Sequence, residues 1–320
     1  MKNILFYLTL IALMVGCTKE DDVNPLRGEQ GWHKNNTIDI SGTSRNYHVY
    51  LPQNASNAPM VVLLHGNRSS NNELLGFTNV KAPYKIWETI AAQENIILIV
   101  PNGTNGSNGH RGWNDCRSDS EGNPDANDVL FIESLIDFVS NEHNADDSKV
   151  FAVGTSNGGH MAMRLAQEIP EKLSAFAAIV ASKPVNTQCT NATLPISALL
   201  MNGTEDPINP YDGGAMKSDR GEVLSGQETI EYWVNRNQTD TTPTVSDLPN
   251  TNSSDNTTVK KYLYINGINN TEVAFYEVVG GGHTEPSIAE RYGNLFKAIV
   301  KEQNGDIEMA NEVWDFFKSK

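Results

Sequence analysis

The stretch Val150-Phe151-Ala152-Val153-Gly154-Thr155-Ser156-Asn157-Gly158 decides the fold. Its first four residues are apolar, as in a strand buried on both faces, and its last five form a G-x-S-x-G motif. This motif sets a serine on a sharp turn between a strand and a helix, with small residues two positions away on either side to avoid a backbone clash. The stretch therefore predicts an α/β fold in which Ser156 is a candidate nucleophile; the alternative is an ordinary serine in a glycine-rich turn.

Further apolar runs predict the elements around this turn. Strands are expected at 47–51, 60–64, 96–100, 176–180, 196–201, 260–265 and 273–279. Helices are expected at 86–93, 129–139, 229–234 and 307–317, with another beginning near Asn157. This alternation predicts a mostly parallel central sheet with helices on both faces. Residues 237–258 are rich in polar side chains and are expected to form an excursion, so that 36–320 makes one catalytic domain.

The N-terminal segment reads as an export signal. The apolar run at 4–15 is too short to span a bilayer comfortably, which indicates a signal peptide over 1–16. The sequence Leu13-Met14-Val15-Gly16-Cys17 resembles a bacterial lipobox, so we expect Cys17 to carry a lipid and 17–35 to form a tether. The acidic run at 20–22 is similar to the export signal of some surface lipoproteins. These features predict an extracytoplasmic protein that is lipid-anchored to the outer membrane and surface-exposed; a cleaved signal with Cys17 merely nearby is the alternative.

Composition limits the possible partners and cross-links. The formal charge of −15 provides no general basic surface, which argues against nucleic-acid binding. Two further cysteines, Cys116 and Cys189, would lie in an oxidising compartment, which favours a disulfide over two unpaired thiols.

A serine nucleophile needs a base and an acid, which in this architecture follow it in the order acid, then histidine. His283 follows a predicted strand within a glycine run, whereas His160 lies one turn beyond Ser156 and is expected to line the pocket or to pack. Asp206 lies in the short segment 202–206 that directly follows the predicted strand at 196–201, and it is the expected acid, with Glu205 as its rival.

Two backbone N–H groups are expected to stabilise the oxyanion, one from Asn67 after the strand at 60–64 and one from Asn157 after the nucleophile. His65 is expected to hold its loop, and with His160 it is a candidate for contact with substrate. The sequence contains no H-E-x-x-H, no C-x-x-C and no G-x-G-x-x-G opening a helix, so we expect no metal and no nucleotide cofactor.

Several segments together resemble the secreted esterases grouped as the poly(3-hydroxybutyrate) depolymerase and feruloyl esterase family of α/β-hydrolases. The matching segments are LLHGN (63–67), VPNGTNG (100–106), GWND (112–115), NDVLFI (127–132), GTSNGGHM (154–161), MNGTEDPINPYDGG (201–214), VVGGGHTEP (278–286) and NGDIEMANEVWDFF (304–317). The resemblance covers nearly the whole chain from about Gly42. It implies an α/β-hydrolase fold, hydrolysis of carboxylic esters, and a triad of Ser156, Asp206 and His283; the pairing of Cys116 with Cys189 also fits it.

The chain departs from that family directly after His283. The family usually carries Thr-Trp-Pro there, whereas this chain has Thr284-Glu285-Pro286. Glu285 thus replaces an aromatic substrate contact and could disfavour an anionic substrate. Trp113 is expected either to supply an aromatic wall or to pack in the core.

The resulting expectation is a monomeric, lipid-anchored serine esterase that acts on feruloyl or acetyl esters of plant polysaccharides. The alternatives are a depolymerase of polyhydroxybutyrate or its oligomers, a serine peptidase on the same fold, and a noncatalytic glycan-binding surface lipoprotein.

Overall fold

The computed structural model describes residues 29–190 and 192–320. The expected signal peptide over 1–16 and the lipidation of Cys17 lie outside these residues. The expected tether over 17–35 needs a correction at its end, because an ordered strand already begins at Gly31. None of the helices in the described part of the chain is both long and apolar enough to cross a membrane.

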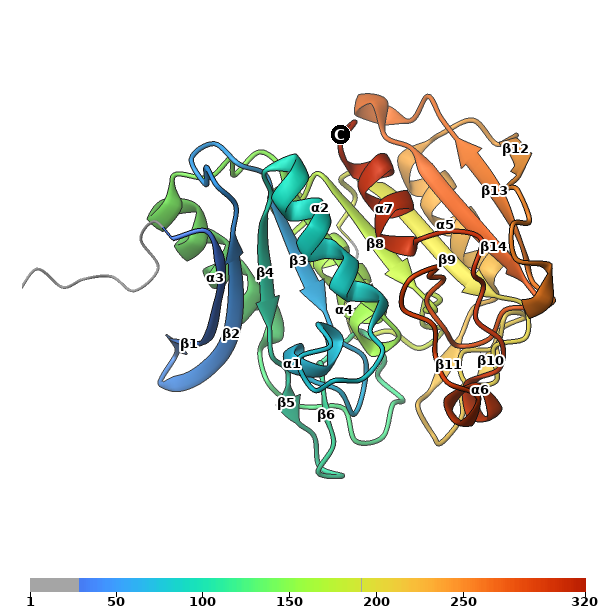
Figure 1. Ribbon diagram of the computed structural model, residues 1–320, viewed down its shortest axis with the longest axis horizontal. Coiled ribbons are helices and arrows are strands. Elements are labelled where there is room, and N and C mark those ends of the chain that lie inside the picture. The colour runs from blue at the N-terminus through green and yellow to red at the C-terminus, as the bar shows by residue number, and fades with distance from the viewer. Residues whose placement is uncertain (1–28, 191) are drawn as a thin grey trace, which may run out of the picture.

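The strands alternate with helices along the chain (Figure 1). The strands are β1 (Gly31–Ile40), β2 (Thr43–Leu51), β3 (Met60–Leu64), β4 (Ile97–Pro101), β5 (Thr104–Asn105), β6 (Arg111–Gly112), β7 (Val150–Thr155), β8 (Ala175–Ile179), β9 (Ser197–Gly203), β10 (Gly214–Ala215), β11 (Glu222–Val223), β12 (Thr244–Asp247), β13 (Thr258–Tyr264) and β14 (Val273–Val279). The helices are α1 (Asn71–Leu74), α2 (Ile86–Glu94), α3 (Asp128–His143), α4 (Asn157–Glu168), α5 (Gly226–Asn237), α6 (Asn294–Val300) and α7 (Met309–Phe317). Short 3-10 helices cover Pro83–Lys85, Pro170–Lys172, Ser253–Asp255 and Ile268–Asn270.

One large sheet organises the molecule, in the strand order β1-β2-β4-β3-β7-β8-β9-β14-β13-β12. The six strands from β4 to β14 pair in parallel, and the two strands at each edge pair antiparallel. Every residue of β3, β4, β7, β8 and β9 is buried, which explains why the central residues of these strands are apolar instead of alternating.

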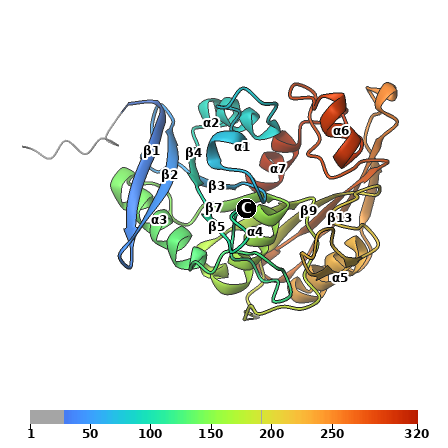
Figure 2. The ribbon, with the colours of Figure 1, turned by 90° about the horizontal axis from the view of Figure 1, so that it is seen from below.

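Helices cover both faces of this sheet, as Figure 2 shows. α3, α4 and α5 pack on one face in a core that includes Phe131, Met161 and Trp233. α2 and α7 pack on the other face in a second core that includes Trp87 and Phe317. The mostly parallel, doubly covered sheet predicted from the sequence is confirmed, and it is the α/β-hydrolase fold.

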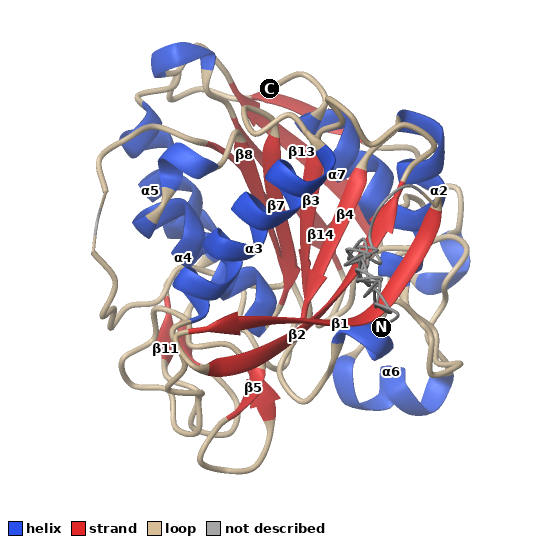
Figure 3. Cartoon of the chain, turned by 90° about the vertical axis from the view of Figure 1, so that its left-hand side faces the viewer, coloured by secondary structure: helices blue, strands red, loops and turns tan. Residues whose placement is uncertain are grey.

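The sequence did not predict the outer strands and some short helices. β1 forms an antiparallel hairpin with β2 along one edge of the sheet (Figure 3), and β12 lies at the other edge, inside the expected polar excursion. Polar residues make up most of the exposed positions of both strands, so neither carries an apolar run. At the carboxyl ends of the parallel strands gather α1, α6 and the small β5-β6 and β10-β11 ribbons (Figure 1).

Candidate functional site

Ser156 occupies the turn between β7 and α4 in a strained conformation. Its φ of 54° and ψ of −120° are unusual for a residue with a side chain, and its N–H donates to the Ile179 carbonyl at 2.9 Å. The turn fits closely against its surroundings, since a Cβ on Gly158 would lie 2.2 Å from the Leu64 carbonyl oxygen. One on Gly154 would lie 2.1 Å from the Gly158 carbonyl. Both glycines of the motif are therefore required by close approach of the backbone.

His283 and Asp206 meet at the carboxyl ends of β14 and β9. The His283 Nδ1 and Asp206 Oδ2 atoms lie 2.7 Å apart. The other carboxylate oxygen of Asp206 accepts from the backbone N–H groups of Ile208 and Asn209, at 2.8 and 2.9 Å, which fixes the orientation of the carboxylate. Glu205, the rival acid, is exposed to solvent.

A cleft of about 710 Å³ brings these residues together. Ser156, His283 and Asn67 all line it, so the nucleophile, the base and one expected oxyanion donor share one space. Its other walls come from the segments around α1, the 3-10 helix Pro83–Lys85 and α6. We refer to it as the main cleft.

Asn157, the residue after the nucleophile, stabilises the turn through its side chain. Its backbone N–H lies in the first turn of α4, where N–H groups have no partner within the helix. Its side chain is buried: Nδ2 donates to Asp115 Oδ2 at 2.6 Å and to the Trp113 carbonyl at 3.2 Å, while Oδ1 accepts from the Trp113 N–H at 2.7 Å. The side chain thus ties the nucleophile turn to the loop that contains residues 113–117.

That loop is anchored by a disulfide and a buried ion pair. Cys116 and Cys189, 73 residues apart, are joined in a disulfide. The Arg117 guanidinium lies 2.6 Å from the Asp115 carboxylate. Burial alone would raise the pKa of Asp115, but the Arg117 charge reverses this effect and holds that pKa below its usual value. A charged Asp115 is therefore available to hold Asn157.

Three candidates for contact with substrate do not line the main cleft, and the structure gives each the packing or loop-holding role that the sequence had left open. Trp113 is fully buried outside the main cleft, and its indole N–H donates to the His65 carbonyl at 2.8 Å. His65 is also buried; its Nε2 accepts from the Gly103 N–H at 3.0 Å, so it holds the loop and does not line the cleft. His160 is buried on α4 beneath the turn and likewise does not line it. Burial lowers the pKa of His65 to about 4 and, with the nearby Arg117 charge, that of His160 to about 3.

Glu285 does line the main cleft, as the departure from the family pattern led us to expect. One of its carboxylate oxygens accepts from the Thr155 hydroxyl, directly before the nucleophile, and the other accepts from the Tyr292 hydroxyl at 2.6 Å. At the position where the resembled family usually has tryptophan, this chain therefore has a hydrogen-bonded carboxylate in the wall of the cleft.

Sequence reasoning missed several residues of the main cleft. Tyr84, Tyr292 and Phe296 supply aromatic surface, and Arg68 and Arg220 supply positive charge. None of these residues lies in a recognisable motif. Only Arg68 lies beside one, since it directly follows LLHGN. Within the described residues, no group of three or more His, Cys, Asp or Glu side chains is arranged to hold a metal ion.

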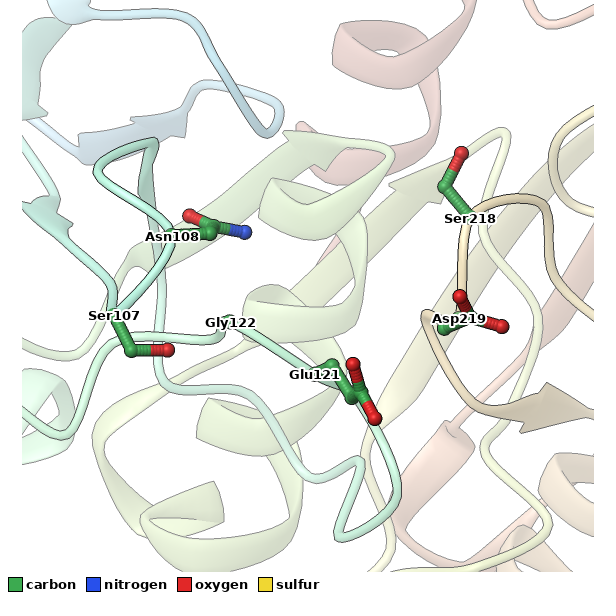
Figure 4. A pocket seen from close by; sticks show the side chains of 6 residues that line it. All are labelled: Ser107, Asn108, Glu121, Gly122, Ser218 and Asp219. Carbon is green, nitrogen blue, oxygen red and sulfur yellow. The ribbon is translucent and has the colours of Figure 1, made fainter.

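A second hollow of about 370 Å³ is lined mostly by polar residues (Figure 4). Ser107 and Asn108 lie on one side of it, and Ser218 and Asp219 on the other, with Glu121 between them. We refer to it as the polar hollow. Asp219 directly precedes Arg220 of the main cleft, so one loop borders both spaces.

Known proteins with similar sequences are esterases. Over 87% of its length, this chain is 24% identical to "Putative esterase NocK" of Nocardia uniformis subsp. tsuyamanensis, of which the match covers 80%. It is 28% identical to "Probable feruloyl esterase C" of Aspergillus niger, over 69% of this chain and 76% of that protein. It is 29% identical to a bifunctional acetylxylan esterase/xylanase of Neocallimastix patriciarum, over 53% of this chain but only 22% of that longer protein.

A solved structure has the same fold. The acetyl xylan esterase from Aspergillus awamori superposes with a TM-score of 0.51 at 18% identity, covering 83% of this chain and 98% of that one. The model of the family described as "Putative esterase" matches residues 39–285. This chain therefore belongs to that esterase family and is a carboxylic ester hydrolase.

Proposed function

We propose that this chain is a serine esterase in which Ser156, His283 and Asp206 act as a triad. The observation that carries the proposal is the 2.7 Å contact of His283 Nδ1 with Asp206, beside a serine held on the strained turn of the same cleft. Ser156 Oγ attacks the ester carbonyl while His283 Nε2 takes its proton, and Asp206 accepts a hydrogen bond from Nδ1–H.

The attack of Ser156 forms a tetrahedral intermediate, which then collapses to an acyl-enzyme. The negative charge on the carbonyl oxygen is stabilised by the backbone N–H groups of Asn67 and Asn157. His283 returns its proton to the departing alkoxide, which leaves as an alcohol. His283 then takes a proton from water, which attacks the acyl-enzyme, and returns that proton to Ser156 Oγ as the acid product is released.

We propose feruloyl or acetyl esters of plant polysaccharides as the substrates. Relatives named as feruloyl and acetylxylan esterases support this class. The aromatic side chains of Tyr84, Tyr292 and Phe296 suit a planar acyl group. The adjoining polar hollow offers hydroxyl, amide and carboxylate groups that suit sugar hydroxyls.

The rim of the main cleft favours one alternative, an oligomer of polyhydroxybutyrate. On α6, Leu295, Phe296 and Ile299 are 86%, 45% and 60% exposed, and Phe296 and Ile299 reach the cleft. An apolar surface beside the ester-binding space suits a polyester chain better than a sugar chain.

The proposed site of action is the cell surface, where Cys17 would carry a lipid. This proposal is supported by the lipobox-like sequence that ends at Cys17 and by the acidic run that follows it.

A substrate panel separates these candidates. The chain from residue 20 onward is assayed on methyl ferulate, acetylated xylan and hydroxybutyrate oligomers, with Ser156→Ala alongside. We expect the highest kcat/KM on the ferulate or the xylan. Cleavage of the oligomers alone would reject the polysaccharide esters, and equal activity of the variant would reject the triad.

A further inference from the structure

Two arginines of the main cleft stand apart from the other arginines in the described residues. Arg68 and Arg220 both line the cleft with Ser156 and His283, and neither guanidinium makes a hydrogen bond or ion pair with any described residue. Every other described arginine is engaged: Arg45, Arg117, Arg164 and Arg291 with carboxylates, and Arg111 and Arg236 with backbone carbonyls. Two guanidiniums without a protein partner in one cleft, in a chain with a charge of −15, are available to bind a group of opposite charge.

The backbone holds Arg68 in place at some cost. Arg68 has φ of 62°, in the left-handed region that non-glycine residues rarely adopt, and its N–H donates to the Arg111 carbonyl at 2.7 Å. It directly follows Asn67, the expected oxyanion donor. The main chain at Arg68 is thereby fixed beside the expected oxyanion donor, and its side chain, which is exposed, lines the cleft.

Arg220 is held from the other side by the anchored loop. Its carbonyl accepts from Arg117 Nη1 at 2.9 Å, and Ser120 forms an antiparallel bridge with it. Arg117 is itself fixed by the buried Asp115 carboxylate. Burial and the charges of Arg117 and Arg68 lower the pKa of Arg220, as expected for positive groups held near each other.

The acidic groups of the cleft do not neutralise this pair. Glu285 is bonded to Thr155 and Tyr292, and Glu73 accepts from the Ser70 hydroxyl at 3.1 Å. Lys81, the remaining cation of the cleft, lies 3.5 Å from Glu290.

We propose that Arg68 and Arg220 form a carboxylate-binding subsite, so that preferred substrates carry a free carboxylate close to the scissile ester. The inference rests on the proposed esterase function and narrows its substrate class. A guanidinium presents paired N–H donors that match the two oxygens of a carboxylate, and such charge-assisted bonds are the stronger ones. A bound carboxylate would also relieve the repulsion between the two arginines. The proposed subsite favours anionic substrates and so differs from the expectation, drawn from the sequence, that Glu285 disfavours them.

The carboxylate could belong to either half of the ester, and matched substrates distinguish the two. For the acyl half, monoethyl succinate is compared with ethyl butyrate, which has a methyl group in place of the carboxylate. For the alcohol half, 4-acetoxybutanoate is compared with butyl acetate. The ratio of kcat/KM for the anionic ester to that for the neutral ester is measured for each pair.

The wild-type chain is compared with Arg68→Gln, Arg220→Gln and the double variant. Lys217→Gln is the matched control, because it removes an exposed positive charge from the loop of Arg220 without touching the cleft. We expect the double variant to lower the ratio by about 10- to 100-fold for one pair of substrates. We expect the control to change it by less than about twofold, since exposed charges at a distance are screened.

Three results would count against the subsite. An unchanged ratio in the double variant for both pairs, with neutral esters still hydrolysed, overturns the subsite but leaves the esterase function intact. An equal loss on anionic and neutral esters also overturns it, because the arginines would then serve catalysis in general. Failure of the wild-type chain to hydrolyse either anionic ester, with methyl ferulate or acetylated xylan still cleaved, would overturn the subsite alone, whereas failure on all of these esters would overturn the proposed function as well.

Discussion

Asp206 uses its two carboxylate oxygens for different tasks: one meets His283, and the other binds its own loop. Replacing Asp206 with Asn keeps the shape but allows the histidine to adopt the wrong tautomer. We expect Asp206→Asn to lower kcat by about 10⁴-fold, as measured on a p-nitrophenyl ester. Glu205→Gln is the matched control, since it removes the neighbouring exposed carboxylate, and we expect it to retain wild-type kcat. A large loss in the control with little loss in Asp206→Asn would reverse the assignment of the acid.

The positions of individual side chains were predictable where a strand end fixed them. Ser156, Asp206 and His283 each follow an apolar strand, and parallel strands bring their carboxyl ends to one edge of the sheet. The sequence left open whether Trp113 forms a wall of the cleft or packs in the core, because its burial depends on how the loop at 102–127 packs over the nucleophile turn. That packing brings together residues that are far apart in the sequence, such as Trp113 and His65, and no local sequence pattern predicts it.

Among the elements, the turn between β7 and α4 depends most on small residues. A Cβ on Gly158 would overlap the Leu64 carbonyl, so Gly158→Ala must displace β3 or α4. We expect it to lower the free energy of unfolding by about 2 kcal/mol or more, as measured by urea denaturation. Gly293→Ala is the control, because a Cβ there meets nothing within 4 Å, and it should change stability by less than about 1 kcal/mol. Equal stability of the two variants would show that the turn is not tightly packed.

The disulfide-bonded loop links stability to the site. Replacing Cys116 and Cys189 together with Ser should destabilise the fold by about 2–4 kcal/mol, because the disulfide closes a loop of 73 residues in the unfolded chain. The neighbouring Asp115 should then hold Asn157 less firmly, so kcat should also fall. Urea denaturation and ester turnover measure both effects. Unchanged values in both would mean that the loop is anchored by Arg117 and Asp115 alone.

Whole elements were predicted best at the centre of the sheet and worst at its edges. The strand at 60–64 is observed with the same bounds, because a strand buried on both faces is apolar throughout. β1, with the sequence GWHKNNTIDI, is partly exposed and held by its pairing with β2. Its order comes from hydrogen bonding to a neighbouring strand, which composition does not reveal.

For the molecule as a whole, two buried histidines predict how stability depends on pH. The folded pKa values of about 4 for His65 and about 3 for His160 lie below the value near 6.5 of an unfolded histidine. Between about pH 6 and pH 4 the unfolded chain therefore binds more protons, and stability falls as pH falls. Each histidine contributes up to about 1.4 kcal/mol per pH unit.

Urea denaturation of the wild type and His160→Gln between pH 7 and pH 5 tests this dependence. We expect the variant to lose less stability than the wild type over this range, whatever its stability at pH 7. Identical losses would mean that His160 is protonated, or accessible to protons, in the folded state.

The proposed membrane location of the molecule depends on Cys17. If Cys17 carries a lipid, Cys17→Ala should move the protein from the membrane fraction to the soluble fraction, as detected by fractionation and immunoblotting. Thr18→Ala serves as the control and should remain with the membrane. Membrane attachment of the Cys17 variant would contradict the proposed anchor.

The most direct test of the whole account is the hydrolysis of a p-nitrophenyl ester by the wild type and Ser156→Ala at equal concentration. The proposed triad predicts that the variant folds with the same circular dichroism spectrum and loses about 10⁶-fold in kcat. Turnover by the variant at the wild-type rate would show that Ser156 is not the nucleophile.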